Sequence, residues 1–134
     1  MADDNFFDLE IISPERSFFV GKAKFLELTT SEGEIGIYKN HIPMTNVLAP
    51  GIVTIHQADG IKEAAVHSGF IVILKDSVKI MAEVAEWPEE IDAQRADEAR
   101  KRAEKRLKEG KNVDMARAEA ALKRSLVRLN LKGR

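Results

Sequence analysis

One stretch decides how the chain is organised: Glu86-Trp87-Pro88-Glu89-Glu90-Ile91-Asp92-Ala93-Gln94-Arg95-Ala96. Before it, short apolar–polar alternations between turn residues indicate strands, and after it a charged, alanine-rich segment has helical spacing. Pro88 has a fixed φ and no N–H, and both properties suit the first turn of a helix. The acidic residues that follow favour the positive end of a helix dipole. We therefore predict that a helix begins at Pro88 and that the chain divides into two domains, 1–85 and 86–134.

The first domain shows the period-two alternation of half-buried strands, as in Phe7-Asp8-Leu9-Glu10-Ile11. Turn residues such as Ala58-Asp59-Gly60 separate one strand from the next. The expected strands are Phe7–Ile11, Ser17–Thr30, Gly33–Tyr38, Gly51–Gln57, Ile61–His67, Phe70–Leu74 and Val78–Val84, with a loop at Lys39–Pro43. Seven or eight short strands without an intervening helix predict a β-sandwich or a flattened barrel.

The second domain has an apolar line at helical spacing, formed by Ala96, Ala99, Ala103 and Leu107. Gly110 is suited to end this helix, and Asn112 or Asp114 to cap a second one that continues through Leu129. Two helices joined by so short a linker fold back as an antiparallel hairpin. The fold class is therefore α+β in sequence, with an N-terminal β-sandwich and a C-terminal helical hairpin. Because alanine stripes bury little apolar area, we expect the hairpin to be marginally stable alone.

Charge and composition restrict the classes of function. The net charge of −1 combines 12 acidic and 7 basic residues in 1–85 with 10 acidic and 14 basic residues in 86–134. The absence of cysteine excludes disulfides, thiolate catalysis and cysteine-ligated zinc. No apolar run approaches the length of a membrane span, and the acidic N-terminus lacks a secretory signal pattern. We expect a cytoplasmic protein without direct membrane insertion.

Motifs for catalysis are missing from the sequence. His41, His56 and His67 have no close spacing and no neighbouring acidic cluster, so we expect ordinary surface or edge histidines. No phosphate-binding glycine loop, nucleophile elbow or zincin motif occurs. We therefore predict no catalytic residue, no metal ligand and no enzyme activity.

Arginines give the sharper signal, at Arg95 and Arg102 on the first helix and at Arg124 and Arg128 on the second. The planar guanidinium fork binds phosphate oxygens in bidentate fashion. A carboxylate such as Asp92 or Glu86 is able to accept from a purine amino group or a ribose hydroxyl. From spacing alone, however, solvated and self-paired helix faces explain the same residues, and nucleic-acid binding by the basic helices stays open.

Three blocks together resemble one protein family: Gly33-Glu34-Ile35-Gly36-Ile37 with His41-Ile42-Pro43, then His67-Ser68-Gly69-Phe70, then the charged hairpin. They are similar to the epsilon subunit of bacterial F-type ATP synthase, over almost the whole chain and in the same order. The resemblance implies a sandwich of about ten strands, a two-helix C-terminal domain and a subunit that is not itself catalytic.

The resemblance also implies a place in the rotor of a proton-translocating ATP synthase. An epsilon subunit binds the gamma subunit and the c-ring, peripherally at the cytoplasmic face of the cell membrane. Its sandwich helps to couple rotation to the catalytic head. Its hairpin inhibits ATP hydrolysis when it extends along gamma and reaches the alpha/beta head.

Some bacillus-type members of the family bind ATP on the folded hairpin through an Ile/Leu-Asp-x-x-Arg-Ala motif. Ile91-Asp92-Ala93-Gln94-Arg95-Ala96 matches this motif, while the linker between the helices differs by a residue. The resemblance implies that ATP binds as a regulatory ligand without being turned over and favours the compact hairpin. The implied ligand residues are Glu86, Asp92, Arg95, Ala96, Arg102, Arg124 and Arg128.

Two other readings use the same residues. A stand-alone ATP-sensing protein would use the hairpin without a rotor partner. A nucleic-acid-binding adaptor would use the basic helices, with strong salt dependence. Neither reading accounts for the motifs of the first domain.

Overall fold

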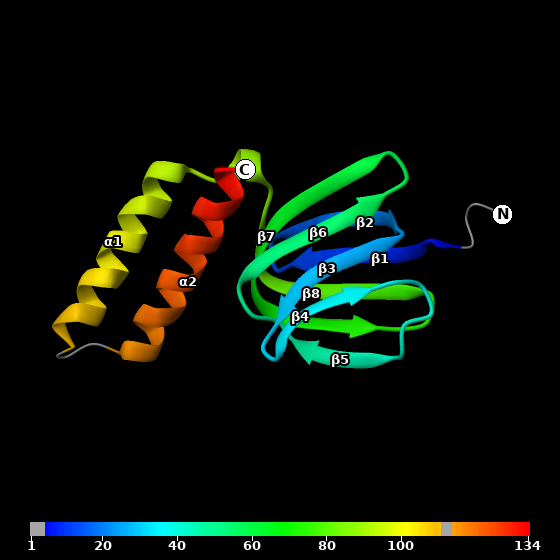
Figure 1. Ribbon diagram of the computed structural model, residues 1–134, viewed down its shortest axis with the longest axis horizontal. Helices are drawn as coiled ribbons and strands as arrows, with labels where there is room; N and C mark the ends of the chain where they lie inside the picture. The colour runs from blue at the N-terminus through cyan, green and yellow to red at the C-terminus, as the bar shows by residue number, and fades with distance from the viewer. Residues whose placement is uncertain (1–4, 111–113) are drawn as a thin grey trace. The chain divides into compact units, whose positions relative to one another are not determined.

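The computed structural model describes residues 5–110 and 114–134 of the chain. It divides into two compact units, Met1–Glu86 and Trp87–Arg134, which we call the β unit and the helical unit (Figure 1). Glu86 is thus the last residue of the β unit.

Eight strands form the described part of the β unit. They are β1 (Phe7–Ser13), β2 (Arg16–Ala23), β3 (Phe25–Thr30), β4 (Gly33–Ile37), β5 (Met44–Val47), β6 (Gly51–Gln57), β7 (Gly60–Ile73) and β8 (Ser77–Glu86).

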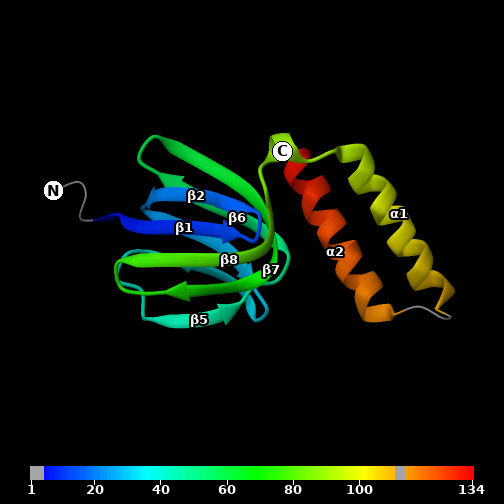
Figure 2. The same ribbon diagram turned by 180° about the vertical axis from the view of Figure 1, so that it is seen from behind.

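The strands are hydrogen-bonded in the order β2-β1-β8-β7-β6-β3-β4, and β5 pairs with β7. The pairing of β1 with β8 is parallel, and the other named pairs are antiparallel. The first half of β7 pairs with β6, while its residues Phe70–Ile73 pair with β5. One long strand therefore belongs to both layers of the sandwich, which Figures 1 and 2 show from opposite sides.

The core of the β unit consists of the inward positions of alternating strands. The most deeply buried aliphatic side chains are Leu9, Ile11, Leu26, Ile37, Ile55, Ile71, Ile73 and Ile80. Each contributes about 2 kcal/mol by leaving water. This aliphatic core, rich in β-branched isoleucine, is the main apolar contribution to the stability of the β unit.

β7 is irregular just after His67, where Ser68 and the facing Glu83 drop out of the pairing with β8 without a shift in register. Ser68 has φ 57° and Gly69 has φ 123°, both in the left-handed region. A Cβ on Gly69 would lie 2.0 Å from the carbonyl oxygen of Met81. Only glycine fits at this position, because the backbone of β8 passes directly against it.

The helical unit contains a short 3-10 helix, η2 (Pro88–Glu90), followed by α1 (Ala93–Glu109) and α2 (Met115–Lys132). Gly110 ends α1 with φ 64°, and its N–H donates to the carbonyl oxygen of Arg106. The two helices run antiparallel and lie side by side (Figures 1 and 2). No helix in the described residues is long and apolar enough to cross a membrane.

The structure confirms a sandwich followed by a helical hairpin but corrects several boundaries. The predicted helix start at Pro88 is wrong, because Ile91 is extended (φ −87°, ψ 127°) and α1 begins only at Ala93. The described residues contain eight strands, as the alternation predicted, whereas the resemblance implied ten or so. Ile61–His67 and Phe70–Leu74 are parts of one strand. Conversely, Ser17–Thr30 breaks at Lys24 into two strands, and β5 was not predicted.

Candidate functional site

Both helices of the helical unit begin in the same way. Asp92 precedes α1 and its Oδ1 accepts a hydrogen bond from the Arg95 N–H at 3.1 Å. Asp114 precedes α2 and its Oδ1 accepts from the Arg117 N–H, also at 3.1 Å. Each aspartate satisfies an N–H that the helix itself leaves without a partner. Of the two caps proposed from sequence for the second helix, Asp114 is this one, and Asn112 lies outside the described residues.

Small side chains line the contact between the helices. Ala96 and Ala103 are buried on α1, and Ala118 and Ser125 are buried on α2. The Ser125 hydroxyl donates to the carbonyl oxygen of Ala121 at 2.9 Å and is thereby satisfied within its own helix. Such small side chains permit the two helices to pack closely.

A sequence repeat that was not among the predictions underlies this symmetry. Residues 92–107 and 114–129, offset by 22 positions, share the pattern D-x-x-R-A-[DE]-x-A-x-K-R-[AS]-x-x-R-L. The match is detectable by comparing the helical segment with itself at a fixed offset. The Asp-x-x-Arg-Ala motif thus occurs twice, at Asp92 and again at Asp114.

The repeat places six arginines on one side of the hairpin. Arg95 and Arg102 directly precede the buried residues of α1, and Arg117 and Arg124 directly precede those of α2. In two right-handed antiparallel helices, the residue before a buried one points to the same side of the pair. One turn further along, Arg106 and Arg128 share that side. We call this set the arginine face: Arg95, Arg102, Arg106, Arg117, Arg124 and Arg128.

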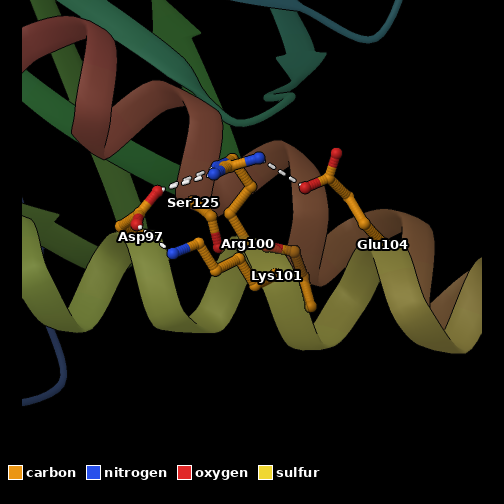
Figure 3. A network of polar contacts seen from close by, with 6 residues as sticks. Asp97, Arg100, Lys101, Glu104 and Ser125 are labelled. Atoms are coloured by element: carbon orange, nitrogen blue, oxygen red, sulfur yellow. Dashed lines mark hydrogen bonds and ion pairs between the residues drawn. The ribbon is translucent and has the colours of Figure 1, made fainter.

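A seventh arginine shows a different environment (Figure 3). Arg100 lies at the other edge of the contact stripe, and its guanidinium bonds Asp97 at 2.7 Å on one side and Glu104 on the other. The hydrogen bond from Arg100 holds the pKa of Asp97 below its usual range, with a further contribution from Lys101. The same bond to Asp97 raises the pKa of Arg100. The charge of Arg100 is therefore matched within its own helix.

Three arginines of the arginine face lack such neutralisation. Among residues 5–110 and 114–134, the guanidinium groups of Arg95, Arg102 and Arg124 form no hydrogen bond or ion pair, whereas Arg128 has a partner. Arg95 and Arg102 are exposed, and Arg124 is half-buried. Unpaired guanidiniums that share one side of a helix pair are suited to bind phosphate oxygens.

The predicted ligand residues fall into two groups. The first group belongs to the helical unit, and its arginines share one side of that unit. Its members are Arg95, Ala96 and Arg102 on α1 and Arg124 and Arg128 on α2. Asp92 is the helix cap, and its second oxygen, Oδ2, accepts from no described residue.

Glu86 belongs to the β unit and is not part of the arginine face. Its Oε1 lies 3.2 Å from Nε2 of His67, a side chain that is 1% exposed and whose Nδ1 has no hydrogen-bond partner. The expectation that His67 is a surface or edge histidine is therefore wrong, because its position on β7 is buried. A role for Glu86 in nucleotide binding stays a prediction. Within the described residues, no group of three or more histidine or acidic side chains is placed to hold a metal ion.

Comparisons with protein families match both units. A model described as "ATP synthase, Delta/Epsilon chain, beta-sandwich domain" matches residues 6–88. A second, described as "ATP synthase, Delta/Epsilon chain, long alpha-helix domain", matches residues 89–133.

Individual relatives are similar over nearly the full length. The ATP synthase epsilon chain of Caldanaerobacter subterraneus subsp. tengcongensis is 43% identical over 96% of this chain and 94% of its own. The ATP synthase epsilon chain of Halalkalibacterium halodurans is 38% identical over 94% of this chain and 96% of its own.

Solved structures show the same fold. A chain in the Euglena gracilis mitochondrial ATP synthase (OSCP/F1/c-ring) matches with a TM-score of 0.80 and 22% identity, covering 96% of this chain and 81% of that one. A chain in the central stalk/c-ring structure of the Tetrahymena thermophila mitochondrial ATP synthase matches with a TM-score of 0.61 and 14% identity, covering 95% and 93% respectively.

Proposed function

The chain belongs to the epsilon-chain family of ATP synthase, and from this membership we propose that it is a non-catalytic subunit of the enzyme's rotor. The matched Tetrahymena structure is described as central stalk and c-ring, which supports a gamma subunit and a c-ring as the partners of the β unit. The subunit would then lie peripherally at the cytoplasmic face of the membrane and help to couple proton transport to ATP synthesis.

The helical unit is the regulatory part in this proposal, and its ligand is one ATP that is not turned over. One observation supports it most: Arg95, Arg102 and Arg124 share one side of the hairpin without a partner among the described residues, while Arg100 is matched by Asp97 and Glu104. A helix pair that neutralises Arg100 and leaves these three arginines unpaired has a surplus of donors for an anion.

Each remaining residue of the helical unit has a definite part in such a site. Asp92 caps α1 with Oδ1 and keeps Oδ2 for a donor group of the nucleoside. Ala96 is 4% exposed, and its small side chain lets α1 and α2 approach so that arginines of both helices reach one ligand. Arg128 lies one turn beyond Arg124 on the same side.

The charge of the two helices makes the hairpin sensitive to an anion. Seven basic and four acidic residues lie in Ala93–Glu109, and five basic and one acidic residue lie in Met115–Lys132. Both helices are therefore positive and repel each other, and only alanines, a serine and a few leucines hold them together. A bound triphosphate supplies negative charge and acceptor oxygens. Arginines of both helices that donate to it favour the closed hairpin by mass action.

Opening of the hairpin is the proposed inhibitory step. Without the anion, repulsion and a thin apolar contact lower the free energy needed to separate the helices. Separated basic helices would meet the alpha/beta catalytic head and slow ATP hydrolysis. The assembled enzyme tests this step: a chain ending before Pro88 should raise the rate of hydrolysis, and an unchanged rate would remove the inhibitory role.

Hydrogen exchange of the purified full-length chain tests ATP binding. With ATP, backbone amides of α1 and α2 should exchange more slowly in the wild type and in Arg100→Gln, but not in Arg95→Gln. Glutamine keeps the helix propensity of arginine, so each variant removes a charge and leaves the helix intact. Equal exchange with and without ATP in the wild type would refute the nucleotide proposal.

A further inference from the structure

The arginine face has two ends that are built alike. Antiparallel helices that present the same repeated residues to each other are related by an approximate two-fold axis. The 22-residue repeat makes Arg117 the equivalent of Arg95, and Arg106 the equivalent of Arg128. The equivalence extends to the caps, whose hydrogen bonds have the same length of 3.1 Å.

Along the helix axes, the arginine face therefore consists of three successive pairs of arginines. Arg95 and Arg128 lie at the entry end, where the chain enters α1 and leaves α2. Arg102 and Arg124 form the centre. Arg106 and Arg117 lie at the loop end, where α1 ends and α2 begins, about 17 Å along α1 from the entry end. The nucleotide proposal uses the entry end and the centre and leaves the loop end without a role.

We propose that Arg106 and Arg117 form a second anion site, which takes a phosphate-class anion without a nucleoside. Both side chains are exposed, and their guanidinium groups pair with no described residue. They repeat, through the two-fold axis, the positions of Arg128 and Arg95.

The acidic residues nearest to Arg106 on α1 do not neutralise it. Glu104 accepts from Arg100, and Oε1 of Glu109 lies 4.0 Å from Nζ of Lys105. On α2, Glu119 follows the buried Ala118 and so points to the other side of the hairpin. Asp114 lies at the loop end as well, where its Oδ1 accepts from the Arg117 N–H. Its one charge does not balance Arg106 and Arg117 together, so the loop end keeps a local positive charge.

Inorganic tripolyphosphate is the probe, titrated calorimetrically into the full-length chain without divalent cations. All variants carry Arg95→Gln, so that the entry end contributes little to the signal. The test variant adds Arg106→Gln and Arg117→Gln. The matched control adds Lys101→Gln and Lys123→Gln, which are also equivalent through the repeat, remove the same charge and lie off the arginine face.

The Arg95→Gln chain should still bind tripolyphosphate. Loss of Arg106 and Arg117 should weaken binding by at least about tenfold, while the lysine control should change it by less than about twofold. Absence of binding by the Arg95→Gln chain, or equal weakening in test and control, would overturn the second site. Far-UV circular dichroism verifies that every variant keeps its helices.

ATP titration of the wild type separates this site from the nucleotide proposal. If ATP binds but the loss of Arg106 and Arg117 does not weaken tripolyphosphate binding, only the proposal of the second site is refuted. If ATP does not bind but tripolyphosphate binding depends on those two arginines, the second site stands and the nucleotide proposal fails.

Discussion

Replacement of the two capping aspartates separates a structural from a ligand role of Asp92. Asp92→Ala and Asp114→Ala each remove one cap of the same geometry, with an oxygen 3.1 Å from a backbone nitrogen. The loss of such a cap costs about 1 kcal/mol. Each variant should therefore disfavour its helix by about fivefold, and to the same extent in both, because the caps are equivalent.

ATP affinity should distinguish the two variants. Any weakening that arises only from a less stable hairpin is shared by both. Asp92 has the additional oxygen, Oδ2, that we propose accepts from the nucleoside, and the loss of a charged hydrogen bond costs about 1.5–3 kcal/mol. Asp92→Ala should thus bind ATP at least about tenfold more weakly than Asp114→Ala.

The assay is an ATP titration followed by the fluorescence of Trp87, which lies directly before η2. Far-UV circular dichroism of the same samples measures the helix loss and should give equal values for the two variants. If Asp114→Ala weakens ATP binding as much as Asp92→Ala does, Asp92 is a cap only and the proposed nucleoside contact is wrong.

Four further substitutions, one of them a control, test the packing and electrostatics of the two units. The bond to Arg100 lowers the pKa of Asp97 from 3.8, so Asp97 stabilises α1 above that value and stops doing so as pH falls through the lowered pKa. Circular dichroism should therefore show that acidification removes less helix in Asp97→Asn than in the wild type. Gly69→Ala should destabilise the β unit by about 3 kcal/mol or more in urea unfolding, since its Cβ would lie 2.0 Å from a backbone oxygen. Gly33→Ala, with φ 125° but open space, should cost clearly less, and equal midpoints would contradict the clash. Ala103→Leu should overpack the helix contact by about 1–3 kcal/mol and speed amide exchange in α1 and α2, whereas unchanged exchange would show that the contact has room.

The β unit is predictable from sequence wherever its strands have one buried face. β1 alternates buried and exposed side chains, and so do β3 and most of β8, which makes their period visible. β5 was missed because three of its four residues are exposed and the fourth is half-buried, so it has no alternation. β7 was divided in two because residues 64–67 are all buried and Ser68 and Gly69 then have left-handed φ values, so its period-two alternation is interrupted.

The junction shows how a strong local signal can be assigned to the wrong turn. Pro88 does begin a helical turn, but that turn is η2, which ends before Ile91. The sequence marks two successive starts, a proline and then a capping aspartate, and the second begins α1. Propensity alone does not tell which start continues into a long helix.

The sequence predicts which arginines belong to the candidate site better than it predicts how the two helices relate them. The spacing of Arg95 and Arg102 indicates one side of α1, and that of Arg124 and Arg128 indicates one side of α2. Sequence spacing within a helix does not relate the two sides, which requires the buried stripe and the antiparallel direction. Arg106 and Arg117 were missed for this reason, although the 22-residue repeat contains the signal.

The central claim is that the arginine face of this hairpin binds ATP. Calorimetric titration of ATP into the full-length wild type, Arg95→Gln and Arg100→Gln tests it most directly. We predict one ATP per chain in the wild type, at least about tenfold weaker binding in Arg95→Gln, and unchanged binding in Arg100→Gln, whose charge is already matched by Asp97 and Glu104. Absence of ATP binding in the wild type, or equal affinities of the wild type and Arg95→Gln, would contradict the claim.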